Sequence, residues 1–155
     1  MSVFLVAFRY KNKPNISDLV AKSLPYDCFV LKSQEDIPAL IREIKRKKPQ
    51  FVLGMGQSRR GKLIRIERAA KNVLIKKGKI IRKGNEVLSS TLKLKRIKNT
   101  RISYNAGTYL CNYVYYKLLS AFPKHPRICF LHISKTIPFK KARTIVQNII
   151  TTIFK

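Results

Sequence analysis

The chain has 155 residues, which is enough for one domain with its own hydrophobic core. Hydrophobic residues make up 45% of it, so intrinsic disorder is not the expected state. Lysine and arginine outnumber the acidic residues 34 to 7, and the net charge of +27 should attract polyanions. The basic residues are spread along the chain rather than gathered in one motif, which favours a solvated basic surface over a dedicated nucleic-acid site.

Two further classes of protein are excluded by the composition. No apolar run approaches the roughly 18 residues that span a membrane, and the apolar opening at residues 1–8 is too short for a signal peptide. We therefore expect a cytoplasmic protein without a membrane partner. The cysteines, Cys28, Cys111 and Cys129, are odd in number and show no CxxC spacing, so a disulfide framework and a structural zinc site are not expected.

The first half of the chain alternates short apolar runs with amphipathic stretches. A strand is expected at residues 2–8, and then a helix that extends to residue 24 and begins at Asn15, whose side-chain oxygen can cap the free backbone donors. After a second strand at 28–31, Ser33 and Asp36 resemble a capping box before a helix with apolar residues at 37, 40, 41 and 44. A third strand at 51–53 should break at the glycines 54 and 56.

The second half continues the alternation. Extended segments are expected at 63–66 and 73–75, the latter paired with 79–81 as a hairpin, and a short helix at 89–98. A strand at 101–104, a long helix at 106–122, a strand at 127–132 and a helix at 138–154 complete the chain. Strands separated by long helices predict a single α/β domain, a three-layer α/β/α arrangement with a mainly parallel, twisted central sheet.

Functional residues gather at the carboxyl ends of strands in such sheets, and residues 54–57, Cys111 and His132 all fall there. Cys111 follows the strand at 101–104 and lies in the first turns of the next helix. Free backbone donors and the positive dipole end at a helix start favour the nucleophilic thiolate. The alternative interpretation of Cys111 is a small core residue on a helix.

One histidine and one acid can complete a catalytic set. His132 ends its strand and can project into a crevice, where an imidazole exchanges protons near neutrality; alternatively it is an exposed or hydrogen-bonded strand-end residue. The other histidine, His125, is expected in a surface turn. Glu67 is isolated in a basic stretch, and it could orient His132 or simply form an ion pair with Arg65 or Arg68.

Three motifs surround these residues. Residues 106–112 read Ala-Gly-Thr-Tyr-Leu-Cys-Asn, residues 66–72 read Ile-Glu-Arg-Ala-Ala-Lys-Asn, and residues 130–133 read Phe-Leu-His-Ile. In this order and spacing they resemble the cysteine, glutamate and histidine motifs of the pyroglutamyl peptidases, also called pyrrolidone-carboxylate peptidases. Gly56-Gln57 precedes Glu67 by ten residues, as in that family. The resemblance covers most of the chain, although only the cysteine motif is specific by itself.

The resemblance implies a cysteine peptidase that removes N-terminal pyroglutamyl residues from peptides through an acyl-enzyme. Cys111 would be the nucleophile, His132 its base and Glu67 the residue that orients the histidine. It also implies an aromatic-lined pocket for the lactam, and the matching residues are Phe8, Tyr10, Gln57, Tyr109 and Leu110. No metal or cofactor is implied; the partner is the peptide substrate, and a homo-oligomer is compatible with the family.

Some positions depart from the family pattern. Residues 7–10, Ala-Phe-Arg-Tyr, lack the family's glycine and proline, and residues 59–61 read Arg-Arg-Gly in place of Gly-Gly-Arg. Lys77 stands where the family has an arginine linked to oxyanion stabilisation, so the charge is kept and the guanidinium fork is lost. The segment 76–100 is shortened, and we interpret residues 1–155 as one pyroglutamyl-peptidase-like domain.

These departures leave a second hypothesis open. The chain is then a diverged, weakly active or inactive relative whose basic surface binds nucleic acid or another polyanion. That hypothesis predicts generic binding that falls steeply as the salt concentration rises.

Overall fold

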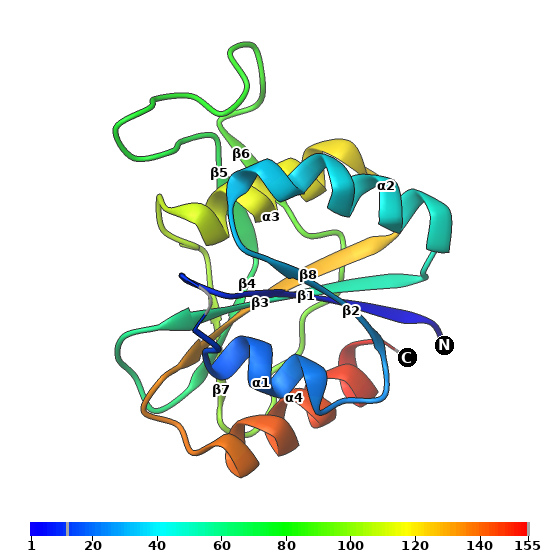
Figure 1. Ribbon diagram of the computed structural model, residues 1–155, viewed down its shortest axis with the longest axis vertical. Helices are drawn as coiled ribbons and strands as arrows, with labels where there is room; N and C mark the ends of the chain where they lie inside the picture. The colour runs from blue at the N-terminus through cyan, green and yellow to red at the C-terminus, as the bar shows by residue number, and fades with distance from the viewer. Residues whose placement is uncertain (12, 155) are drawn as a thin grey trace.

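A six-stranded sheet lies between two layers of helices in the computed structural model, which describes residues 1–11 and 13–154 (Figure 1). The strand order is β2-β1-β3-β8-β4-β7. The bounds of these strands are β1 (Val3–Phe8), β2 (Asp27–Leu31), β3 (Phe51–Ser58), β4 (Ile64–Glu67), β7 (Thr100–Ser103) and β8 (Arg127–Ser134). Neighbouring strands are parallel except for β4 and β8, which confirms the α/β fold with a mainly parallel sheet.

Each face of the sheet is covered by a pair of helices. Helices α1 (Ile16–Lys22) and α4 (Phe139–Ile153) cover one face, and α2 (Ile37–Lys47) and α3 (Leu110–Ala121) cover the other (Figure 1). Successive side chains of a strand point to opposite faces. Leu53 accordingly belongs to the core under α1 and α4, whereas Val52 belongs to the core under α2 and α3. No helix in the described ranges is long and apolar enough to cross a membrane.

Local capping signals in the first half are confirmed. The Asn15 Oδ1 accepts hydrogen bonds from the backbone N–H groups of Ser17, at 3.0 Å, and Asp18, at 3.2 Å, at the start of α1. Ser33 and Asp36 form the expected capping box, which opens a single 3₁₀ turn, η1 (Gln34–Asp36), that leads directly into α2.

The expected break of the third strand at the glycines was wrong. β3 continues in parallel register with β8 as far as Ser58 and Ser134. A Cβ atom at Gly54 would lie 2.3 Å from the Phe130 ring carbon Cδ2. The glycine is therefore needed because a neighbouring side chain occupies the space above the strand, not because the strand ends there.

The segment between β4 and β7 also differs from the expectation. The pairing is between β5 (Ala69–Lys71) and β6 (Val87–Ser89), outside the expected hairpin, and an isolated bridge joins Leu74 to Gly78. The intervening loop projects from the body beyond α3 (Figure 1). Residues 90–98 form no helix; the Ser90 hydroxyl instead donates to the Ile128 carbonyl on β8 at 2.6 Å.

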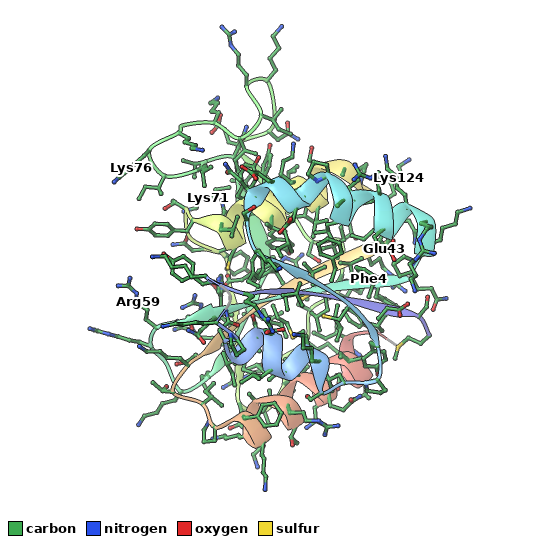
Figure 2. All side chains as sticks on the ribbon, viewed as in Figure 1. Phe4, Glu43, Arg59, Lys71, Lys76 and Lys124 are labelled. Atoms are coloured by element: carbon green, nitrogen blue, oxygen red, sulfur yellow. The ribbon has the colours of Figure 1, made fainter. Side chains whose placement is uncertain are left out.

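Basic side chains project from many sides of the molecule, as the distribution along the sequence predicts. Arg59, Lys76 and Lys124 are all exposed; Arg59 and Lys76 lie on one side of the molecule and Lys124 on the opposite side (Figure 2).

Candidate active site

Cys111 is the second residue of α3. The helix begins at Leu110 rather than at residue 106, because Gly107 has a φ of +85° and Tyr109 is extended. The N-cap residue, Tyr109, makes no side-chain cap hydrogen bond, so the first backbone N–H groups of α3 are available as donors beside Cys111.

Asn112 ties the start of α3 to the segment that follows Glu67. Its side-chain oxygen accepts from the Lys71 N–H at 2.8 Å, and its amide donates to the carbonyls of Lys71, at 2.9 Å, and Val73, at 3.0 Å. Asn112 is fully buried. Its side-chain amide both donates and accepts hydrogen bonds, and it therefore fixes the position of the neighbouring Cys111 relative to the segment after Glu67. The sequence motif includes Asn112, but only the three-dimensional pairing reveals this anchoring role.

Cys111 and His132 both lie close to Gly56 on β3. A Cβ atom at Gly56 would lie 2.5 Å from the Cys111 sulfur and 3.4 Å from the His132 ring carbon Cδ2. The sulfur and the ring are therefore separated by no more than the sum of these two distances. Gly56 pairs with His132 in the β3–β8 register. Because Gly56 has no side chain, the Cys111 sulfur has room beside the His132 ring.

His132 and Glu67 are joined by a hydrogen bond of 2.8 Å between Nδ1 and Oε1. Glu67 is fully buried and His132 is 6% exposed, so of the two alternatives His132 is the hydrogen-bonded residue and not the exposed one. It lies within β8, which continues to Ser134 beyond its expected end at residue 132. Arg65 also donates from Nε to the same Glu67 oxygen, at 3.1 Å, so Glu67 contacts both His132 and Arg65. His125 is exposed in a bend, as expected.

Tyr115 binds the backbone of Glu67. Its hydroxyl donates to the Glu67 carbonyl at 3.0 Å, and its ring packs against Phe130 with a centroid separation of 5.4 Å. Tyr115 lies four residues after Cys111 and therefore one turn further along the same side of α3. One helix thus holds both the candidate nucleophile and the backbone of the acid.

The pKa values of Glu67 and Cys111 are shifted in opposite directions. Burial raises the pKa of Glu67, but its hydrogen bonds with His132, Ser103 and Arg65 outweigh that effect and hold the pKa below its usual value. Burial, and to a smaller extent the Glu67 charge, raise the pKa of the Cys111 thiol to about 12 against the opposing effect of Arg65. These effects disfavour the thiolate form, in opposition to the helix start, which favours it.

A cavity of about 890 Å³ opens over these groups at the carboxyl ends of β3 and β8. Of the predicted site residues, Tyr10, Gln57, Tyr109, Cys111 and His132 line it. Tyr10 and Tyr109 are 69% and 67% exposed, so two aromatic rings are presented to solvent at this cavity. The Gln57 side chain accepts from the Ile16 N–H at 3.1 Å and is thus committed to the start of α1.

Four other predicted residues do not line this cavity: the buried Glu67, Phe8, Leu110 and Lys77. Phe8 is buried and packs against Phe130, with ring centroids 5.9 Å apart. Leu110 is half-buried against the core under α2 and α3. Lys77 is exposed in the turn after Leu74, so the structure does not bring it to the cavity. Within the described ranges, no cluster of three or more His, Cys, Asp or Glu side chains could hold a metal ion.

The comparisons with known proteins place this geometry on a known fold. No protein-family model matches the sequence, and no curated protein is significantly similar to it. Solved structures do match. Pyroglutamyl peptidase I from Bacillus amyloliquefaciens is 20% identical with a TM-score of 0.84, and the match covers 98% of this chain and 94% of that one.

Two archaeal structures match equally well. Pyrrolidone carboxyl peptidase from Thermococcus litoralis is 19% identical with a TM-score of 0.82 over 99% of this chain and 94% of that one. A mutant pyrrolidone carboxyl peptidase from Pyrococcus furiosus is 22% identical with a TM-score of 0.85 over 99% and 98%. At these identities the likeness shows the fold, and it confirms that the chain has the fold of the pyroglutamyl peptidases.

Proposed function

On this fold, we propose that the chain is a cysteine peptidase that removes an N-terminal pyroglutamyl residue from peptides. Cys111 is the nucleophile, His132 the general base and Glu67 the residue that orients the imidazole. The observation that carries the proposal is the 2.8 Å hydrogen bond between His132 and the buried Glu67, in a histidine that lines the same cavity as Cys111. A buried carboxylate bound to Nδ1 leaves Nε2 as the nitrogen that can accept a proton.

The substrate ring is assigned to the aromatic side of the cavity. Tyr10 and Tyr109 present exposed rings there, and such rings can cover the apolar faces of a lactam. Because the Gln57 side chain is engaged with α1, this residue contributes backbone groups to the lactam. Phe8 and Leu110 support the walls of the pocket from the core rather than contacting the ring.

The reaction begins from a protonated thiol. As the Cys111 sulfur attacks the pyroglutamyl carbonyl carbon, its proton passes to Nε2 of His132, and the Glu67 charge stabilises the imidazolium that forms. The imidazolium returns this proton to the amide nitrogen as the carbon–nitrogen bond breaks, which releases the peptide with a free amine. Water then attacks the thioester, His132 takes its proton, and pyroglutamate leaves as Cys111 is protonated again.

The negative charge that develops on the carbonyl oxygen needs donors close to the sulfur. Lys77 is exposed and outside the cavity, so we assign this role to the uncapped N–H groups at the start of α3 instead. These donors are held next to Cys111 by the helix itself.

Hydrolysis of a fluorogenic pyroglutamyl amide tests the proposal. We expect turnover by the wild type and a loss of at least about 10³-fold in Cys111→Ala. Cys28→Ala is the matched control, because Cys28 lies on β2 outside the cavity, and it should retain activity. Circular dichroism should be used to check that each variant folds. Equal turnover by the wild type and folded Cys111→Ala would refute the assignment.

A further inference from the structure

Two arginines lie directly side by side at the edge of the sheet. Arg65 on β4 and Arg101 on β7 are register partners in the parallel pair. Both line the cavity that contains Cys111 and His132. Like charges directly opposite each other on neighbouring strands are destabilising. Arg65 is compensated by Glu67, but Arg101 forms no ion pair with any residue in the described ranges.

Further basic side chains without an ion-pair partner in the described residues lie next to Arg65 and Arg101. Arg59 lines the same cavity, and Arg60 and Lys62 line an adjoining one that shares Arg65 and Arg101 with it. Arg59, Arg60 and Lys62 are exposed, and none of them forms an ion pair within the described part of the chain. Together, Arg59, Arg60, Lys62, Arg65 and Arg101 form what we call the arginine groove.

The sheet order separates Arg65 and Arg101 from Tyr10 and Gln57. Tyr10 follows β1 and Gln57 belongs to β3, whereas Arg65 and Arg101 belong to β4 and β7. In the order β1-β3-β8-β4-β7, His132 on β8 stands between these two pairs, whereas Arg59 follows β3 and Tyr109 follows β7. A substrate whose first ring lies on the aromatic side therefore extends its leaving peptide across His132 and into the arginine groove.

We propose that the arginine groove binds acidic residues that directly follow the pyroglutamyl residue, so the substrates of this protein are acidic peptides. This inference rests on the proposed function and adds a preference to it. Guanidinium groups match carboxylates in shape and charge. The described residues that line the adjoining cavity, Arg60, Gly61, Lys62, Leu63, Arg65 and Arg101, include no aromatic ring on which bases could stack. The two tyrosines of the main cavity are assigned to the lactam, so an acidic peptide fits the groove better than a single-stranded nucleic acid.

The test compares pyroglutamyl-glutamyl-alanine amide with its glutaminyl isostere, which differs only in charge. At low ionic strength we expect kcat/KM to be roughly fivefold to tenfold higher for the glutamyl peptide, and the ratio should fall toward one in high salt. Arg101→Gln should lower the ratio, because this arginine is exposed and unpaired and its replacement leaves the fold intact. Arg82→Gln, which removes the same charge from the exposed loop outside both cavities, should keep the wild-type ratio.

The outcomes separate the two proposals. Turnover of both peptides at equal kcat/KM, or an unchanged ratio in Arg101→Gln, would overturn the arginine groove and leave the peptidase standing. Absence of turnover with every peptide would contradict the peptidase, and fluorescence anisotropy of the two labelled peptides would then test the groove through their ratio of Kd values. Stronger inhibition by an oligonucleotide than by an acidic peptide of equal charge, relieved in Arg101→Gln, would assign the groove to nucleic acid and overturn the proposal.

Discussion

Replacement of Gly56 by alanine tests whether the space above β3 is what positions the nucleophile. The new Cβ would lie 2.5 Å from the Cys111 sulfur and 3.4 Å from the His132 ring. To restore ordinary contact, the sulfur must move by about 1 Å, and a displacement of this size in a catalytic group costs about 10²-fold in rate. Overpacking should also lower the free energy of unfolding by about 1–3 kcal/mol.

Gly54→Ala provides a matched control on the same face of the same strand. Its Cβ would meet the Phe130 ring at 2.3 Å, so it overpacks the core without touching the sulfur. Urea unfolding and hydrolysis of a fluorogenic pyroglutamyl amide should be measured for both variants. We expect both to lose stability and only Gly56→Ala to lose about 10²-fold in kcat. A folded Gly56→Ala with wild-type kcat would refute the claim that this contact positions the sulfur.

Three further predictions concern the groups around the sulfur. Glu67→Gln should lower kcat by about 10²- to 10⁴-fold, because a neutral amide no longer stabilises the imidazolium. The control Glu86→Gln, which replaces an exposed acid, should keep the wild-type kcat, and equal kcat values for the two variants would contradict the role of Glu67. Alkylation of Cys111 by iodoacetamide, followed by peptide mass spectrometry, should be slow at neutral pH and accelerate with pH up to its pKa of about 12, because burial disfavours the thiolate; a plateau below pH 7 would instead reveal a thiolate already formed. Asn112→Ala should lower the free energy of unfolding in urea by about 1–3 kcal/mol, because buried backbone groups lose their partners, and an effect no larger than that of Asn148→Ala at the exposed surface would contradict the anchor.

The parts of the fold that depend on local chemistry could be predicted from the sequence. The Asn15 cap and the Ser33 capping box involve residues two or three positions apart, and both are confirmed. The alternation of strands and helices also predicts the three layers and the mainly parallel sheet.

The errors share one physical cause, which is contact between distant segments. Gly54 and Gly56 suggest the end of a strand when they are considered alone, but they make room for Phe130 and Cys111. Ser90 was assigned to a helix, and its hydrogen bond to Ile128 spans 38 positions. Local periodicity contains no information about such contacts.

The candidate site likewise combines residues that local motifs predict with contacts that only the three-dimensional structure reveals. The motifs point to Cys111, His132 and Glu67, but the bond between the last two spans 65 positions and depends on the antiparallel pairing of β4 with β8. Arg65 and Arg101 carry no motif, and their adjacency appears only when the sheet order is known. The high pKa of Cys111 likewise depends on burial, which the helix-start argument does not include.

The most direct test of the central claim is the mass of the protein quenched with acid during turnover of a pyroglutamyl amide. If Cys111 attacks the carbonyl, a fraction of the protein gains one pyroglutamyl group, and peptide mapping locates it on residue 111. The adduct should be absent from Cys111→Ala. Turnover accompanied by an adduct on another residue, or undiminished turnover by Cys111→Ala, would contradict the account.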